Sequence, residues 1–103
     1  MLPVILKREA SAEVTAAARW YEAQTEGFGV ALLDEIESAL RTIAESPRKW
    51  PRRPGAKSES QLRRFILSRF PYAIGYRAEN TRVVVFAVAH TRRRPDYWFG
   101  RAR

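Results

Sequence analysis

The stretch VVVFAVAHTRRRPDYW, residues 83–98, decides the fold of this chain of 103 residues. No polar side chain occurs in it before His90, and its β-branched valines are typical of a strand that is buried on both faces. We therefore expect a central strand over Arg82–Ala89, covered by helices on one side. This strand leads into three consecutive arginines and the pair Tyr97-Trp98, so its end is the first candidate for a functional site.

Two further strands are predicted before this one, over Leu62–Leu67 and Tyr72–Arg77. The short joints between the three strands favour an antiparallel meander. In the middle strand, Ala73 and Gly75 lie on the same face, because side chains alternate between the faces of a strand. Two such small residues leave room for another group to approach the sheet closely.

The first half of the chain is predicted to begin with a short strand over Pro3–Lys7 and to continue into two helices. Ser11 is predicted to cap the first helix, which ends near Thr25. The second helix is predicted over Val30–Glu45. Its apolar residues recur at helical spacing and form one stripe, which consists of Leu32, Ile36, Leu40 and Ile43. The short connection between the two helices makes them an antiparallel hairpin.

The predicted architecture is a single α+β domain over residues 1–103. Its elements follow the order β-α-α-β-β-β, with the helical hairpin packed on one face of an antiparallel sheet. Lys49–Ser60 is predicted to be a loop, because it contains prolines and a glycine. Trp50 is expected to close the end of the core.

Charge is distributed unevenly along the chain, which has a formal net charge of +8. Residues 1–47 hold four basic and eight acidic side chains, for a net charge of −4. Residues 48–103 hold fifteen basic and three acidic side chains, for a net charge of +12. A field of this sign attracts nucleic acid or an acidic protein.

The residue inventory excludes several kinds of chemistry. The chain has no cysteine and one histidine, so disulfides, thiolate metal sites and multi-histidine metal sites are excluded. Neither a nucleophilic triad nor a glycine-rich phosphate loop occurs, and we expect no cofactor and no metal. No segment is apolar over the length of a membrane helix, so we expect no membrane partner and a cytoplasmic location.

The segment after the central strand combines groups that bind anions. Arginine forks bind phosphate or carboxylate in bidentate geometry, and aromatic rings stack on bases or guanidinium groups. The alternative is that the arginines only solubilise the chain end while the tryptophan packs on the sheet. His90 is interpreted as a structural hydrogen-bonding residue rather than a catalyst. The candidate target-binding residues are Arg92, Arg93, Arg94, Tyr97 and Trp98.

A resemblance to a known family rests on residues 17–47 (AARWYEAQTEGFGVALLDEIESALRTIAESP) and residues 62–98 (LRRFILSRFPYAIGYRAENTRVVVFAVAHTRRRPDYW). The most specific part is a closing His-x-x-Arg-x-Pro-x-Tyr-Trp motif, formed by His90, Arg93, Pro95, Tyr97 and Trp98. These stretches closely resemble the ParE/RelE superfamily of bacterial toxins. The resemblance implies the same order of helices and strands. It also implies the toxin half of a type II toxin–antitoxin system, in a hetero-oligomer with a cognate acidic antitoxin.

Two targets occur among members of this superfamily. ParE-like toxins bind DNA gyrase and stabilise its cleaved-DNA state, whereas RelE-like toxins enter the ribosomal A site and cut mRNA. Many nuclease relatives carry an arginine at the position of Ala73, so the resemblance favours a gyrase-directed binder over an enzyme. The alternatives are a ribosome-dependent mRNA endoribonuclease and a non-toxic nucleic-acid-binding module or decayed toxin. In a nuclease, the catalytic residues are expected among His90, Arg92, Arg93 and Tyr97.

The antitoxin is expected to cover apolar surface on the hairpin and sheet and to reach the basic half of the chain. An amphipathic acidic segment suits such a surface, either as a helix in a groove or as an added strand. The candidate contacts are the residues of the apolar stripe, Leu32, Ile36, Leu40 and Ile43.

Overall fold

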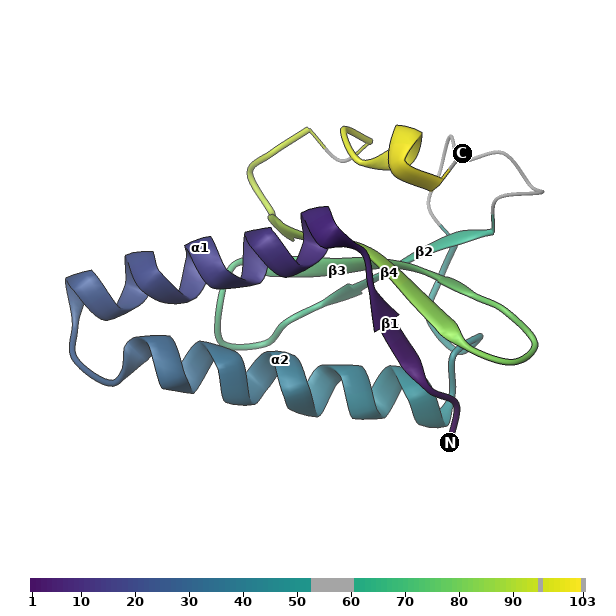
Figure 1. Cartoon of the computed structure of the whole chain (residues 1–103), viewed down its shortest axis with the longest axis horizontal. Coiled ribbons are helices and arrows are strands. Elements are labelled where there is room, and N and C mark those ends of the chain that lie inside the picture. The colour runs from purple at the N-terminus through teal and green to yellow at the C-terminus, as the bar shows by residue number, and fades with distance from the viewer. Residues whose placement is uncertain (53–60, 95, 103) are drawn as a thin grey trace.

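The predicted order of strands and helices is confirmed by a computed structural model, which describes residues 1–52, 61–94 and 96–102. The elements are β1 (Val4–Leu6), α1 (Arg8–Gln24), α2 (Phe28–Glu45), β2 (Leu62–Ile66), β3 (Tyr72–Ala78), β4 (Val83–His90) and the short 3₁₀ helix η1 (Phe99–Ala102). Figure 1 shows α1 and α2 as an antiparallel hairpin beside the sheet, with η1 on the side away from α2.

The four strands form one sheet in the order β1-β4-β3-β2. β2, β3 and β4 make the predicted antiparallel meander. β1 joins the other side of β4 in parallel, with Val4 opposite Val83 and Leu6 opposite Val85, so the sheet as a whole is mixed. The central position predicted for β4 is confirmed, and Val83 to Ala89 are all buried.

The start of α1 differs from the prediction. The helix begins at Arg8 with Lys7 as its cap, so Ser11 lies within the first turns instead of capping them. The reason is the pairing with β4, because the Lys7 N–H donates to the Val85 carbonyl at 2.9 Å while the Lys7 carbonyl accepts from the Ser11 N–H at 3.0 Å. Lys7 therefore ends the strand and begins the helix. Tertiary pairing overrides the local preference of serine for a cap position.

The connection between the helices depends on glycine. Gly27 has a φ of 89°, in the left-handed region that favours glycine. The Glu22 carboxylate accepts the N–H groups of Gly27 at 3.1 Å and of Gly29 at 3.0 Å, which satisfies the start of α2. A Cβ on Gly29 would lie 2.7 Å from the Ala18 carbonyl oxygen, so the two helices approach closely here. α2 begins two residues before Val30 and ends at the predicted position.

Two apolar clusters lie on the two faces of the sheet. The larger cluster packs the hairpin against one face, and its buried members include Ala17, Leu32, Ile36, Ile43, Ile74, Tyr76 and Val85. The smaller cluster covers the opposite face, and its buried members are Leu62, Val84, Phe86, Ala87, Ala89 and Trp98. β4 contributes to both, which explains why its residues are apolar on both faces.

Trp50 packs against the end of the larger cluster, as predicted, and its ring centroid lies 4.6 Å from that of Phe65. Of the loop predicted over Lys49–Ser60, residues 53–60 lie outside the described residues. Among the residues that are described, no helix combines the length and the apolar character needed to cross a membrane.

Candidate functional site

The C-terminal segment comprises residues 91–94 and 96–102 and folds back over the sheet after β4 (Figure 1). Trp98 anchors it, because its side chain is buried and stacks on Phe86 with 6.5 Å between the ring centroids. A Cβ built on Gly75 would overlap the indole, so the room predicted on this face of β3 is occupied by Trp98. Trp98, which was predicted as a target contact, is buried in this structure and packs on the sheet.

His90 fixes the turn by which the chain leaves β4. The Arg92 N–H donates to His90 Nδ1 at 3.1 Å, and the Thr91 N–H donates to the Pro71 carbonyl at 2.8 Å. The imidazole also makes an edge contact with Tyr72, with 5.2 Å between the ring centroids. Because Nδ1 accepts a hydrogen bond, a neutral imidazole carries its proton on Nε2. These contacts agree with the structural role predicted for His90.

Glu13 of α1 joins the C-terminal segment to the edge of β4. Its Oε1 accepts the Val88 N–H and Arg101 Nη1, both at 3.0 Å. Its Oε2 accepts the Tyr97 hydroxyl at 2.7 Å and Arg101 Nη2 at 3.2 Å. Nothing in the sequence pointed to this residue, because its partners lie 75 to 88 residues further along the chain.

Two arginines contact the ring of Tyr97. The guanidinium carbons of Arg93 and Arg101 are 3.8 and 5.1 Å from the ring centroid. Burial, together with the hydrogen bond to Glu13, raises the pKa of Tyr97 to about 12. Desolvation lowers the pKa of Arg101, but the hydrogen bond and charge of Glu13 outweigh this effect and raise the pKa overall. At neutral pH the phenol of Tyr97 is therefore neutral and the guanidinium of Arg101 is charged.

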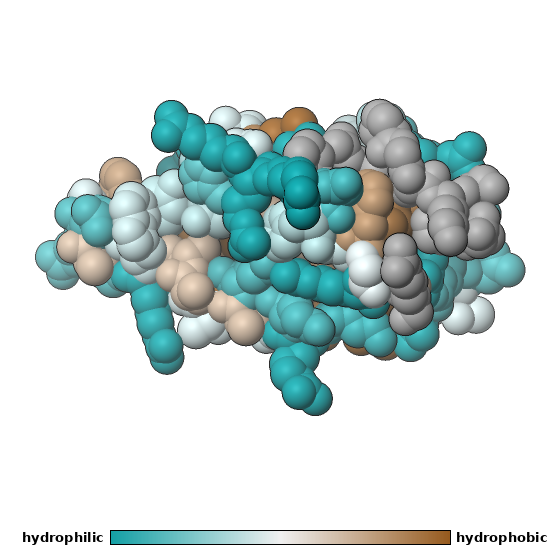
Figure 2. Space-filling model, turned by 90° about the horizontal axis from the view of Figure 1, so that it is seen from above, coloured by the Kyte–Doolittle hydropathy of each residue, from teal (hydrophilic) through white to brown (hydrophobic). Residues whose placement is uncertain are grey.

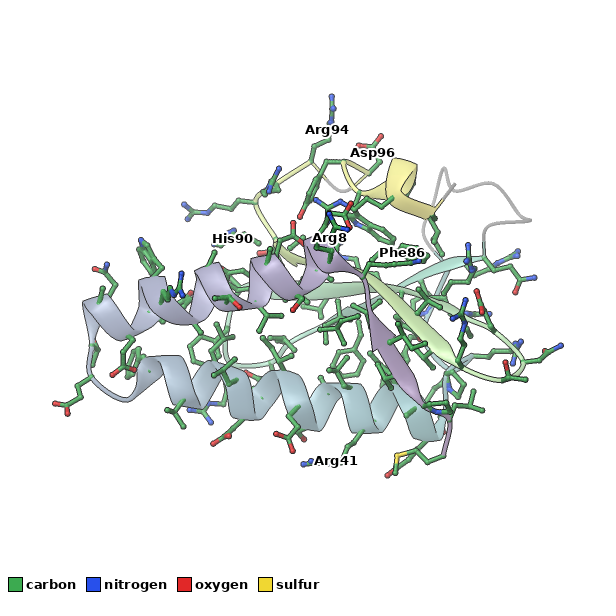
Figure 3. The ribbon with its side chains drawn as sticks, viewed as in Figure 1. Arg8, Arg41, Phe86, His90, Arg94 and Asp96 are labelled. Atoms are coloured by element: carbon green, nitrogen blue, oxygen red, sulfur yellow. The ribbon has the colours of Figure 1, made fainter. Side chains whose placement is uncertain are left out.

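The three consecutive arginines are exposed. The Arg93 side chain is 57% exposed and lies 4.0 Å from Glu13 Oε2, whereas the Arg94 side chain is 82% exposed and pairs with Asp96 at 3.3 Å. Figure 3 shows Arg94 and Asp96 directed away from the body of the molecule. Hydrophilic side chains predominate on this face, which also carries α1 (Figure 2). Arg92, Arg93 and Arg94 are therefore available to a partner.

A groove of about 390 Å³ separates α1 from the start of the C-terminal segment. Three of the predicted site residues, His90, Arg93 and Tyr97, line this groove together, whereas Arg92 and Arg94 lie outside its lining. Its remaining aromatic walls are Trp20, Tyr21 and Tyr72. Aromatic walls beside a guanidinium group suit an aromatic or anionic group of a partner. Pro95 of the closing motif lies outside the described residues.

The apolar stripe of α2, which was predicted to contact the antitoxin, is buried within the chain itself. Leu32, Ile36 and Ile43 are at most 3% exposed and belong to the core beneath the hairpin, while Leu40 is partly buried against the same core. The stripe faces the sheet because an amphipathic helix buries its apolar side. The exposed apolar side chains of the hairpin were not predicted; they are Trp20, Phe28, Val30 and Leu33.

Comparison with known proteins gives concordant findings. Residues 4–95 match the family model described as the ParE toxin of type II toxin–antitoxin system, parDE. A solved structure described as "Chromosomal ParDE TA system from P. aeruginosa" matches with a TM-score of 0.73 at 15% sequence identity, over 87% of this chain and 96% of that chain. At this level of identity, the likeness shows that the two chains share a fold and nothing more. No curated protein sequence matches the chain significantly.

Proposed function

Because the chain belongs to the ParE toxin family of type II toxin–antitoxin systems, we propose that it inhibits growth by binding DNA gyrase and stabilising its cleaved-DNA state. In this proposal the protein acts in the cytoplasm as a binder and catalyses no reaction. The exposed arginines of the C-terminal segment, Arg92 to Arg94, meet the target. The buried strand β4 and the anchored Trp98 support this surface from below, which positions it better than a free loop would.

The observation that carries this choice is the arrangement of Tyr97. Its hydroxyl donates to Glu13 at 2.7 Å, its pKa is raised by burial and by this bond, and Arg93 stacks on its ring. In a nuclease these two side chains would have to reach the ribose hydroxyl and the phosphate of mRNA. The hydrogen bond to Glu13 favours a structural role for the Tyr97 hydroxyl instead, while the Arg93 side chain stays exposed beside it.

Ala73 of strand β3 also argues against RNA cleavage. Phosphoryl transfer requires donors that are already directed at the developing charge, and loss of one such donor commonly lowers the rate on the order of a hundredfold. Ala73 supplies no donor at the position where many nuclease relatives carry an arginine. Binding to a topoisomerase requires only an oriented surface, which exposed arginines can provide.

An acidic antitoxin is the second partner in this proposal, and the two chains form a hetero-oligomer. The basic character of residues 48–103 attracts carboxylates. The exposed apolar residues Trp20, Phe28, Val30 and Leu33 replace the buried stripe as candidate antitoxin contacts. Neutralising the acidic residues of the antitoxin should weaken the co-purified complex. An unchanged affinity would show that charge does not contribute to the binding of the antitoxin.

The proposed target is tested by comparing the purified protein in two assays. The first measures supercoiling and accumulation of cleaved DNA by gyrase, and the second measures mRNA cleavage in programmed ribosomes. We expect cleaved DNA to accumulate and mRNA to stay intact. Codon-positioned cuts in mRNA with gyrase unaffected would support the endoribonuclease instead, with His90, Arg92, Arg93 and Tyr97 as its catalytic candidates. No effect in either assay would favour a non-toxic binding module.

A further inference from the structure

We propose that Glu13 is a positioning residue, which holds the C-terminal segment in the orientation in which its arginines meet the target. The role of those arginines is taken from the proposed function. The new element is a residue of α1 that affects the target surface indirectly, by holding the C-terminal segment in place. Glu13 accepts four hydrogen bonds from three residues, and its side chain is 18% exposed.

The effect of Glu13 on the arginine surface is transmitted by Tyr97. The hydroxyl bond at 2.7 Å fixes the ring, and the guanidinium of Arg93 lies on that ring at 3.8 Å from its centroid. Glu13 Oε2 is also 4.0 Å from Arg93 Nη1, so the carboxylate attracts the same guanidinium directly. Rotation of the phenol would therefore leave Arg93 without its stacking partner.

Glu13 also connects the segment to the sheet at a point where β1 has ended. β1 pairs with β4 over Val83–Val85, and the Val88 N–H lies beyond this pairing. Glu13 Oε1 accepts that N–H and Arg101 Nη1, while Arg101 Nη1 donates also to the Phe86 carbonyl at 3.0 Å. One carboxylate thus fixes α1, β4 and the segment relative to one another.

His90 fixes the backbone of Arg92 and Arg93 at the start of the segment, but the anchors further along are less directional or lie at its end. Trp98 is held by apolar stacking, which fixes the distance of the segment from β3 but is weakly directional. The Ala102 carbonyl accepts Arg77 Nη1 at 3.3 Å near the end of the segment, remote in sequence from the arginines. Hydrogen bonds to a carboxylate are directional and stronger than neutral ones, so the orientation of residues 96–101, and of the Arg93 guanidinium stacked on Tyr97, depends mainly on Glu13.

Replacing Glu13 with glutamine tests the proposal with little change in volume. Both oxygens of Glu13 accept hydrogen bonds, whereas an amide has a single acceptor oxygen. One orientation of the amide leaves the Val88 N–H and Arg101 Nη1 without an acceptor, and the other leaves Arg101 Nη2 without one and forces the Tyr97 hydroxyl to accept instead of donate. Glu26→Gln is the matched control, because it removes the same charge from an exposed residue of the hairpin turn. Tyr97→Phe, which removes one of the four hydrogen bonds, is the second variant should Glu13→Gln fail to fold.

Two measurements on the full chain separate positioning from stability. Hydrogen exchange should become faster in residues 91–102 of Glu13→Gln and stay unchanged in α2. Potency, measured as cleaved DNA and as growth inhibition at equal folded concentration, should fall about tenfold or more, since hydrogen bonds to charged groups contribute on that scale. Leu32→Ala destabilises the hairpin core and should leave potency per folded molecule unchanged. Glu26→Gln should match the wild type in both measurements.

Unchanged exchange in the segment, or unchanged potency at equal folded concentration, would overturn the role of Glu13. Equal losses of potency in Glu13→Gln and Leu32→Ala would overturn it as well, because the effect would then follow stability alone. A wild-type protein that inhibits growth without affecting gyrase would refute the proposed target but leave the growth measurement to decide on Glu13. If the wild type has no effect on growth, the exchange measurement still decides whether Glu13 orients the segment.

Discussion

The two faces of the sheet are covered in different ways. On one face, the hairpin buries many aliphatic side chains, such as Leu32, Ile36 and Ile43, and no single one of them holds the helices in place. On the opposite face, Trp98 is the one buried side chain of the C-terminal segment, and Glu13 is the one carboxylate that accepts hydrogen bonds from both Tyr97 and Arg101, among the described residues. Contacts are distributed on the first face and concentrated on the second.

This difference predicts that the hairpin face mainly supports stability, whereas the opposite face also positions the exposed arginines. A change on the hairpin face removes one contact among many, so it should lower stability while leaving the exposed surface as it was. A change at either anchor of the C-terminal segment should displace the arginines as well. Stability and toxicity should therefore separate for variants of the hairpin face and fall together for variants of the other face.

The largest effect is expected for Trp98→Ala. Removal of a buried aromatic side chain commonly costs about 3–5 kcal/mol of unfolding free energy, and here it also frees the segment. Growth inhibition should fall at equal folded concentration. Leu32→Ala, on the hairpin face, should cost about 2–5 kcal/mol but keep growth inhibition per folded molecule. Denaturant unfolding and growth assays of both variants check this, and retained toxicity in Trp98→Ala would contradict the comparison.

A smaller loss is expected for Gly75→Ala. The added methyl group would overlap the Trp98 indole, so the indole has to move outwards. Overpacking of this kind typically costs about 1–3 kcal/mol. Gly100→Ala is the control, because a Cβ there meets no atom within 4 Å. Near-UV circular dichroism should change in Gly75→Ala alone. An unchanged spectrum in that variant would show that the space between Gly75 and Trp98 accommodates a methyl group.

Two tyrosines, one from each region, make the comparison testable by pH. Burial raises the pKa of Tyr76, whose hydroxyl donates to the Pro47 carbonyl at 2.7 Å, to about 12. The pKa of Tyr97 is also raised to about 12, first by burial and then by Glu13. An unfolded tyrosine titrates near pH 10, so this stabilisation is fully present below about pH 10 and is lost as pH rises through about 12.

The alkaline decline should be measured as the midpoint of urea unfolding between pH 9 and pH 12. Tyr76→Phe and Tyr97→Phe should each make the decline shallower, because each removes one proton that only the unfolded chain releases readily. In the wild type and in Tyr76→Phe, hydrogen exchange in the C-terminal segment should accelerate as Tyr97 ionises. In Tyr97→Phe, which lacks this ionising group, it should not. A decline of the same slope in all three proteins would show that other groups control it.

The fold could be predicted from residues that act over short distances in the sequence. The apolar run of β4 required a central strand, and the spacing of Leu32, Ile36 and Ile43 required a buried helix face. The small residues Ala73 and Gly75 predicted room on one face of β3, although they could not identify Trp98 as the group that fills it. Local pattern therefore gave the elements and their order.

Features that depend on distant contacts could not be predicted in this way. The parallel pairing of β1 places Lys7 against Val85, and this contact shifted the start of α1 away from Ser11. Glu13 reads as an ordinary acidic residue of an early helical turn until Tyr97 and Arg101 are brought to it. The contacts with an antitoxin could not be predicted from periodicity either, because an apolar stripe at helical spacing marks the side of the helix that packs against the chain's own core.

The smallest effect on stability, and the most direct test of the central claim, is expected when Arg92, Arg93 and Arg94 are all replaced by alanine. The pair between Arg94 and Asp96 is largely exposed, and the stacking of Arg93 on Tyr97 contributes about 0.5–1 kcal/mol at such a site, so unfolding free energy should fall by about 1 kcal/mol or less. The decisive measurement is the amount of cleaved DNA that gyrase accumulates with the wild type and with this variant, at equal folded concentration. We predict that cleaved DNA accumulates with the wild type and falls to the background level with the triple variant. Equal accumulation with both proteins would contradict the assignment of the arginines as the target-facing surface.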